Sequence, residues 1–103
     1  MTRAVPSSRD AAAGLSAERA LTAEDLLVLV NDVLGVVCGV DPRSLTAQTE
    51  LASIGADSLA RVELAEQVEE RLTVDLPGLH IPDGDLGGFD TVGDVRDYLS
   101  ARL

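Results

Sequence analysis

The sequence predicts an all-α domain, a small bundle of helices, and three observations support this prediction. Two threonines, Thr22 and Thr91, each precede an aspartate by three residues, a spacing typical of helix starts. Apolar residues recur three or four positions apart after both threonines and across residues 58–72. Only Phe89 and Tyr98 are aromatic, so we expect a core of Leu, Val, Ile and Ala, which suits close packing of small helices.

The first helix is expected to begin at Thr22 and to include the apolar stretch from Leu26 to Val37. Its many valines, which are stiff in helices, leave a strand as the alternative. The length of the stretch and the threonine cap favour the helix. Gly39 and Pro42 should end it. The apolar residues at helical spacing are Leu26, Val30, Val33, Leu34 and Val37.

A long connection, residues 41–57, leads to the second helix, residues 58–72. The connection has three isolated apolar residues, expected to anchor it to the domain: Leu45, Leu51 and Ile54. In the second helix, Leu64, Val68 and Leu72 lie four residues apart, with Arg61 and Ala65 beside them. This stripe should face the core, and the acidic residues should face water.

The last part of the chain is expected to be a loop followed by a helix. Residues 73–90 contain two prolines and four glycines, with room for one helical turn near Asp83 to Leu86. The final helix should begin at Thr91. Its buried side is predicted from Val92, Val95, Leu99 and Leu103.

Residues 1–20 are expected to form a disordered arm ahead of one domain at residues 21–103. The arm is rich in Ala, Ser and Arg and has no sustained apolar period, so it should be dispensable for folding. It lacks the apolar region of a secretory signal. No stretch reaches the roughly 18 apolar residues of a membrane span. We therefore expect a cytoplasmic protein.

The charge and the rare residues exclude several function classes. Acidic residues outnumber basic ones 18 to 8, a formal charge of −10, so nucleic acid is excluded as a partner and basic surfaces are favoured. Cys38 is the only cysteine and His80 the only histidine. No internal disulfide is possible, and Cys38 is expected to be a small buried apolar residue. With one cysteine and one histidine, the chain has few candidate residues for a hydrolytic triad or a zinc site, so no catalytic or metal-binding residue is assigned.

The most informative segment is LASIGADSL, residues 51–59, where the connection enters the second helix. Ser58 stands at the helix start, with Asp57 before it and Leu59 after it. A helix start offers free N–H groups and the positive end of the helix dipole, so a phosphate on Ser58 would be stabilised there. The alternative is that Ser58 or Asp57 is only a helix N-cap, and three residues alone do not decide between these readings.

The surroundings of Ser58 resemble the acyl carrier protein family. The pattern V-D-P-x-x-L-T-x-x-T-x-L precedes L-x-x-I-G-A-D-S-L, and an acidic amphipathic helix follows. The resemblance continues through Ile-Pro-Asp at 81–83 and Thr-Val-Gly-Asp-Val at 91–95 to Tyr98 and Leu99, covering residues 22–103. It implies a four-helix bundle with a long first loop and a short or irregular third helix.

By this resemblance, Ser58 takes the position of the serine that bears 4'-phosphopantetheine, with Asp57 and Leu59 beside it. The thiol of this arm would hold acyl intermediates as thioesters, and the chain, expected as a monomer, would have no catalytic activity. The implied partners are a phosphopantetheinyl transferase, an acyltransferase, a ketosynthase and tailoring enzymes with basic docking patches. The residues at docking positions are Leu59, Val62, Glu63, Glu66, Glu69 and Glu70.

Some features depart from the family pattern. Residues 76–80 look like an insertion, the third helix is rich in glycine, and Ala60 stands where many members have an acid. Asp57 favours an acyl over an aminoacyl cargo. The lysine-free chain and the insertion favour polyketide or other secondary-metabolite synthesis over fatty acid synthesis, and Met1 favours a free-standing carrier.

Two other functions remain as alternatives. The segment from Asp83 to Asp94 resembles a calcium-binding EF-hand loop, but Gly87 provides no side-chain ligand and Asp94 is shorter than the usual glutamate. The chain could also be an interaction module in which Ser58 is never modified. Mass spectrometry after incubation with coenzyme A and a transferase separates this alternative from a carrier.

Overall fold

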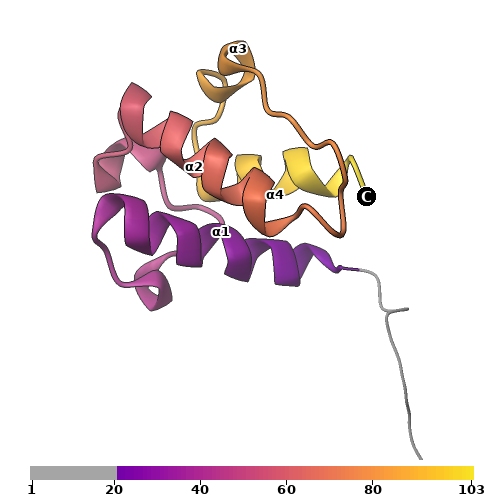
Figure 1. Ribbon diagram of the computed structural model, residues 1–103. Coiled ribbons are helices and arrows are strands. Elements are labelled where there is room, and N and C mark those ends of the chain that lie inside the picture. The colour runs from indigo at the N-terminus through magenta and orange to yellow at the C-terminus, as the bar shows by residue number, and fades with distance from the viewer. Residues whose placement is uncertain (1–20) are drawn as a thin grey trace, which may run out of the picture.

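The computed structural model describes residues 21–103, which form four α-helices and two short 3-10 helices (Figure 1). This confirms the predicted all-α class, and no strand is present in this range. The expectation for residues 1–20 lies outside the described residues. In chain order the elements are α1 (Ala23–Cys38), η1 (Pro42–Ser44), η2 (Leu51–Ile54), α2 (Ser58–Arg71), α3 (Asp83–Leu86) and α4 (Val92–Ser100).

Helix α1 begins at the predicted cap. The Thr22 hydroxyl accepts a hydrogen bond from the Asp25 backbone N–H at 3.1 Å, and the Asp25 carboxylate accepts one from the Thr22 N–H at 3.0 Å. Each side chain thereby satisfies a backbone donor that the helix leaves free. The helix ends at Gly39, whose φ of 70° is the left-handed conformation expected of a C-terminal glycine.

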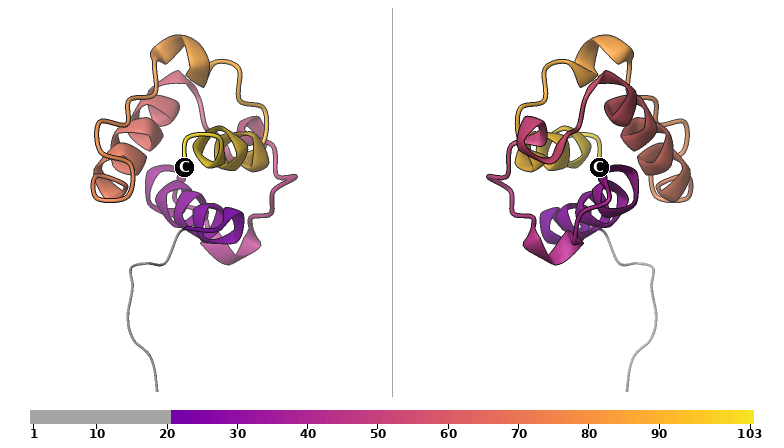
Figure 2. Two further views of the ribbon diagram at one scale, coloured as in Figure 1. Left: turned by 90° about the vertical axis from the view of Figure 1, so that its right-hand side faces the viewer. Right: turned by 90° about the vertical axis from the view of Figure 1, so that its left-hand side faces the viewer.

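The core lies between α1, α2 and α4, and α3 lies apart from α1 against α2 (Figure 2). The stripe of Leu64, Val68 and Leu72 on α2 is buried, as predicted. Leu45 and Leu51 anchor the long connection in the same core, and Ile54 packs against it. The other buried apolar side chains are Leu26, Val30, Val33, Leu34, Ala56, Ala65, Ile81, Leu86, Phe89, Val92, Val95 and Leu99.

Two residues differ from the burial expected of them. Leu103 is 53% exposed, because α4 ends at Ser100 and the chain turns away before the next core position. Cys38 is only half-buried, because it is the last residue of α1, at the edge of the core. Neither residue therefore contributes fully to the packing.

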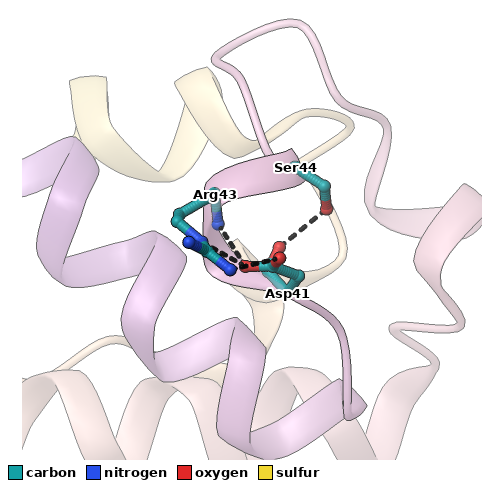
Figure 3. A network of polar contacts seen from close by, with 3 residues as sticks. All are labelled: Asp41, Arg43 and Ser44. Carbon is teal, nitrogen blue, oxygen red and sulfur yellow. Dashed lines mark hydrogen bonds and ion pairs between the residues drawn. The ribbon is translucent and has the colours of Figure 1, made fainter.

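The connection between α1 and α2 starts with a turn closed by Asp41 (Figure 3). Its carboxylate accepts hydrogen bonds from the Arg43 backbone N–H at 2.9 Å and from the Arg43 guanidinium at 3.2 Å. Its carbonyl oxygen accepts one from the Ser44 hydroxyl at 2.7 Å. Arg43 holds the pKa of the Asp41 carboxyl below its ordinary value of 3.8.

The rest of this connection is fastened to the start of α4. The Leu51 N–H donates to the Asp90 carbonyl at 2.9 Å, and the Gly93 N–H donates to the Ala47 carbonyl at 2.8 Å. A Cβ atom on residue 93 would lie 2.9 Å from the Ala47 carbonyl oxygen, so only glycine permits this approach. The segment that leads to Ser58 is therefore held in place by α4.

Replacing Asp94 by Asn should lower the melting temperature by a few degrees at pH 7, and the difference from wild type should shrink as pH falls below 3.8. The Asp94 carboxylate accepts from the Asp90 and Thr91 N–H groups at 2.8 and 3.0 Å, which lowers its pKa below the ordinary value of 3.8. Its stabilisation is thus complete above pH 3.8 and is lost as pH falls through the lowered pKa. Thermal unfolding of both proteins from pH 7 to pH 2 checks this.

The matched control is Asp75→Asn, because Asp75 is exposed and its side chain has no hydrogen bond within residues 21–103. It should leave the pH dependence unchanged. A constant difference between Asp94→Asn and wild type at every pH would contradict the prediction.

No helix within residues 21–103 is long and apolar enough to cross a membrane.

Candidate functional site

Ser58 is the first residue of α2, and its side chain is exposed. Its neighbour Asp57 is the N-cap, and the Asp57 carboxylate accepts a hydrogen bond from the Ala60 N–H at 2.9 Å. The Ser58 hydroxyl has no hydrogen-bond partner within the described part of the chain. Asp57 therefore does the capping, and the hydroxyl of Ser58 remains available for chemistry.

A tight turn before α2 directs Ser58 outward. Gly55 adopts a φ of 80°, a left-handed conformation that other residues rarely adopt. The chain then passes through Ala56, which is buried and donates its N–H to the Leu51 carbonyl at 3.0 Å. Because Ala56 points inward, the next residues are turned toward solvent at the start of the helix.

The C-terminal end of α1 lies beside this site. Burial, together with the negative charges of Asp57 and Glu63, raises the pKa of the Cys38 thiol above its ordinary value of 9.0. The thiol is therefore protonated at neutral pH and is a poor nucleophile.

A pocket of about 230 Å³ opens next to Ser58, between α2 and α3. Arg61, half-buried, forms one wall and donates hydrogen bonds to three backbone carbonyl oxygens. The remaining walls are mainly apolar at Val62 and Leu86 and acidic at Asp83. The lining residues are Ser58, Arg61, Val62, Asp83, Leu86 and Gly87.

The predicted docking residues follow α2 from its first turn. Leu59 is 68% exposed, although it is apolar, and three acids lie exposed along the same helix: Glu63, Glu66 and Glu70. Val62 is half-buried, because it packs against the core and lines the pocket. The structure thus gives Ser58 an apolar neighbour and a row of acids.

Glu69 lies in a different environment from the other acids. Its half-buried carboxylate accepts a hydrogen bond from the Ile81 N–H at 2.7 Å and lies 3.6 Å from the His80 ring nitrogen. It thereby fastens the segment after α2 to the helix. The place of Glu69 in partner docking stays a prediction, and its structural contacts were not anticipated.

The calcium alternative gains no support from the structure. Asp94 already caps α4, and the Asp85 carboxylate accepts a hydrogen bond from the Tyr98 hydroxyl at 2.8 Å. Within residues 21–103 no three or more His, Cys, Asp or Glu side chains are grouped to hold a metal ion.

The helical spacing predicts Arg61 beside the core stripe but gives no indication of its hydrogen-bond partners. Those partners are backbone carbonyls, two of them 25 and 28 residues later in the chain, which no side-chain pattern reveals. The available signal was a charged residue next to buried Leu64 and Ala65, because a charge in such a position needs hydrogen-bond partners.

Comparisons with known proteins agree with this geometry. The family described as "Phosphopantetheine attachment site" matches residues 24–99. The chain is 35% identical over 81 residues to the meromycolate extension acyl carrier protein of Mycobacterium leprae, covering 78% of this chain and 66% of that protein. It is 32% identical over 79 residues to an acyl carrier protein of Rhodococcus erythropolis, covering 76% and 81% of the two chains.

A solved structure is also similar. It is 3-oxo-butyl-ACP, an intermediate mimic from the actinorhodin polyketide synthase of Streptomyces coelicolor. The TM-score is 0.58 and the identity 30%, with 82% of this chain and 93% of that chain covered. The match to the Mycobacterium leprae protein covers less of the relative: this chain spans just under two thirds of that protein's length, at 66%.

Proposed function

The chain belongs to the acyl carrier protein family, and we propose that Ser58 is the residue that bears its 4'-phosphopantetheine arm. Members of this family are carriers without catalytic activity. The observation that carries the proposal is the Ser58 hydroxyl, exposed and without a partner in the described chain, on the first residue of α2. The family match, residues 24–99, includes this position.

The start of α2 suits the phosphate of such an arm. The N–H groups of the first helical turn are free of helical partners, apart from that of Ala60, which Asp57 caps. A phosphodiester on the Ser58 oxygen would lie at the positive end of the helix dipole. Because Asp57 is engaged in capping, it is not assigned as a base, and the transferase must remove the hydroxyl proton.

The test is loading of the full chain by a broad-specificity phosphopantetheinyl transferase with coenzyme A. Intact-protein mass spectrometry should show one added phosphopantetheine, and peptide mapping should place it at Ser58. A chain that gains no mass, while a known carrier is loaded in the same reaction, would favour the interaction module instead.

We further propose that the acyl cargo belongs to polyketide or another secondary-metabolite synthesis. The support is the similar solved carrier, which comes from a polyketide synthase and bears a 3-oxobutyl mimic. The meromycolate extension relatives make fatty acid synthesis the second candidate. Mass spectrometry of the arm on protein isolated from its own cells separates the two, because polyketide chains retain keto groups and fatty acyl chains are reduced.

Leu59→Ala should weaken the docked complex with the transferase about tenfold in Kd, because Leu59 is an exposed apolar side chain next to Ser58. Surface plasmon resonance measures this, and the loss should appear in the dissociation rate. The control is Val74→Ala, because Val74 is 87% exposed but follows the far end of α2. Equal losses in both variants would contradict a docking site around Ser58.

A further inference from the structure

Helix α3 cannot hold its own position. It is one turn of four residues, too short for a stable helix in isolation. Gly84 lies within the helix, and Gly87 and Gly88 follow directly after it. The N-cap residue is Pro82, which makes no side-chain cap hydrogen bond. Leu86 is its one buried residue. Its placement beside Ser58 must therefore come from contacts with other elements.

Arg61 supplies such contacts from α2. Its Nη1 donates to the carbonyl oxygens of Leu86 at 2.8 Å and Phe89 at 2.6 Å, which lie at and just after the C-terminal end of α3. Its Nε donates to the Ala56 carbonyl at 3.1 Å. One guanidinium thus connects the turn before Ser58 with the chain that leaves α3.

The charge of Arg61 has no acidic partner among residues 21–103. The ion pairs within residues 21–103 do not include it, and all three acceptors are backbone oxygens. The planar guanidinium can donate in several fixed directions at once, which an ammonium group cannot match. The last carbonyls of a helix also carry its negative dipole end, so a cation is favoured there.

A second anchor holds α3 from the opposite side. The Tyr98 hydroxyl on α4 donates to the Asp85 carboxylate at 2.8 Å, and the Tyr98 ring contacts Phe89 edge-on at 5.2 Å between centroids. This anchor fastens α3 to α4. Within residues 21–103, Arg61 is the residue whose side chain hydrogen-bonds both to the turn before Ser58 and to the C-terminal end of α3.

We propose that Arg61 is a positioning residue that fixes α3 against the start of α2 and so sets the shape of the pocket beside Ser58. Arg61, Leu86 and Ser58 all line this pocket, and Arg61 is hydrogen-bonded to Leu86. The proposal rests on the proposed function only in that Ser58 is the attachment residue. Loss of the guanidinium should free α3 and its flanking chain while the three-helix core stays folded.

The test is amide hydrogen exchange, followed by NMR, on the unmodified full chain with Arg61→Met. Exchange at the Gly88 and Phe89 N–H groups, which close the turns after α3, should become at least about tenfold faster. Core amides of α1, such as Val33, should stay within about twofold of wild type. Arg71→Met, which removes an exposed arginine from the same helix, should change neither.

Arg61→Lys keeps the aliphatic part of the side chain and the positive charge but loses the planar guanidinium group. It should therefore also speed amide exchange at Gly88 and Phe89. If it behaves as wild type, or if Arg61→Met leaves both amides unchanged, the proposal is overturned. Equal acceleration in α1 and α3 overturns it as well, because Arg61 would then support the whole fold. Should Arg61→Met not fold, Arg61→Lys decides by the same criteria.

Loading by the transferase is measured separately on the same proteins. Ser58 is present in each, so every variant should still gain the phosphopantetheine mass. Absence of loading in wild type would reject the proposed function, whereas unchanged exchange in the Arg61 variants would reject only the positioning role.

Discussion

Ser58→Ala should abolish all gain of phosphopantetheine mass while leaving the melting temperature within about 2 °C of wild type. The modification needs the hydroxyl oxygen, so its loss should be complete rather than partial. The fold should not respond, because the side chain is exposed and makes no hydrogen bond within residues 21–103. Alanine is also the best helix former, and Asp57 still caps the helix.

Two serines of the preceding connection are internal controls for this result. The Ser53 hydroxyl donates to the Glu50 carbonyl at 2.6 Å, and the Ser44 hydroxyl donates to the Asp41 carbonyl at 2.7 Å. Both side chains are exposed, so exposure alone does not single out Ser58. If Ser58→Ala still gained the mass of one phosphopantetheine, the assignment would be wrong, and peptide mapping would show which serine had taken its place.

The helices and their caps could be predicted because their signals are local. Thr22 and Thr91 each bond to an aspartate three residues later, so a stretch of four residues contains the whole interaction. Gly55 likewise acts within its own turn. The position of Ser58 at a helix start follows from these local signals, whereas the identity of the attached group came from resemblance to a family.

The anchors of α3 could not be predicted because their partners are distant in sequence. Arg61 donates to carbonyls 25 and 28 residues later, and any residue type supplies a carbonyl. Glu69 accepts from the Ile81 N–H twelve residues away for the same reason. Backbone partners leave no pattern of side chains in the sequence. Only the folded chain therefore reveals that Arg61, expected beside the core, and Glu69, expected on a docking surface, hold the segments around α3.

Glu63→Arg and Glu66→Arg should each slow loading of Ser58 by about three- to tenfold at about 0.1 M salt. Both acids are exposed on α2, five and eight residues after Ser58, and a transferase with a basic surface would meet them as it approaches. Exposed charges mainly raise the association rate, so the effect should appear in kcat/KM. It should shrink in about 0.5 M salt, where screening shortens the range of the charges.

The matched control for these reversals is Asp75→Arg. Each reversal changes the net charge by the same two units, from −10 to −8. Asp75 lies beyond the C-terminal end of α2, and the fourteen residues of that helix separate it from Ser58 by roughly 20 Å. At about 0.1 M salt that distance is twice the screening length, so Asp75→Arg should change loading less than twofold. Equal slowing by all three reversals would show that only the bulk charge acts, and the docking surface on α2 would have to be abandoned.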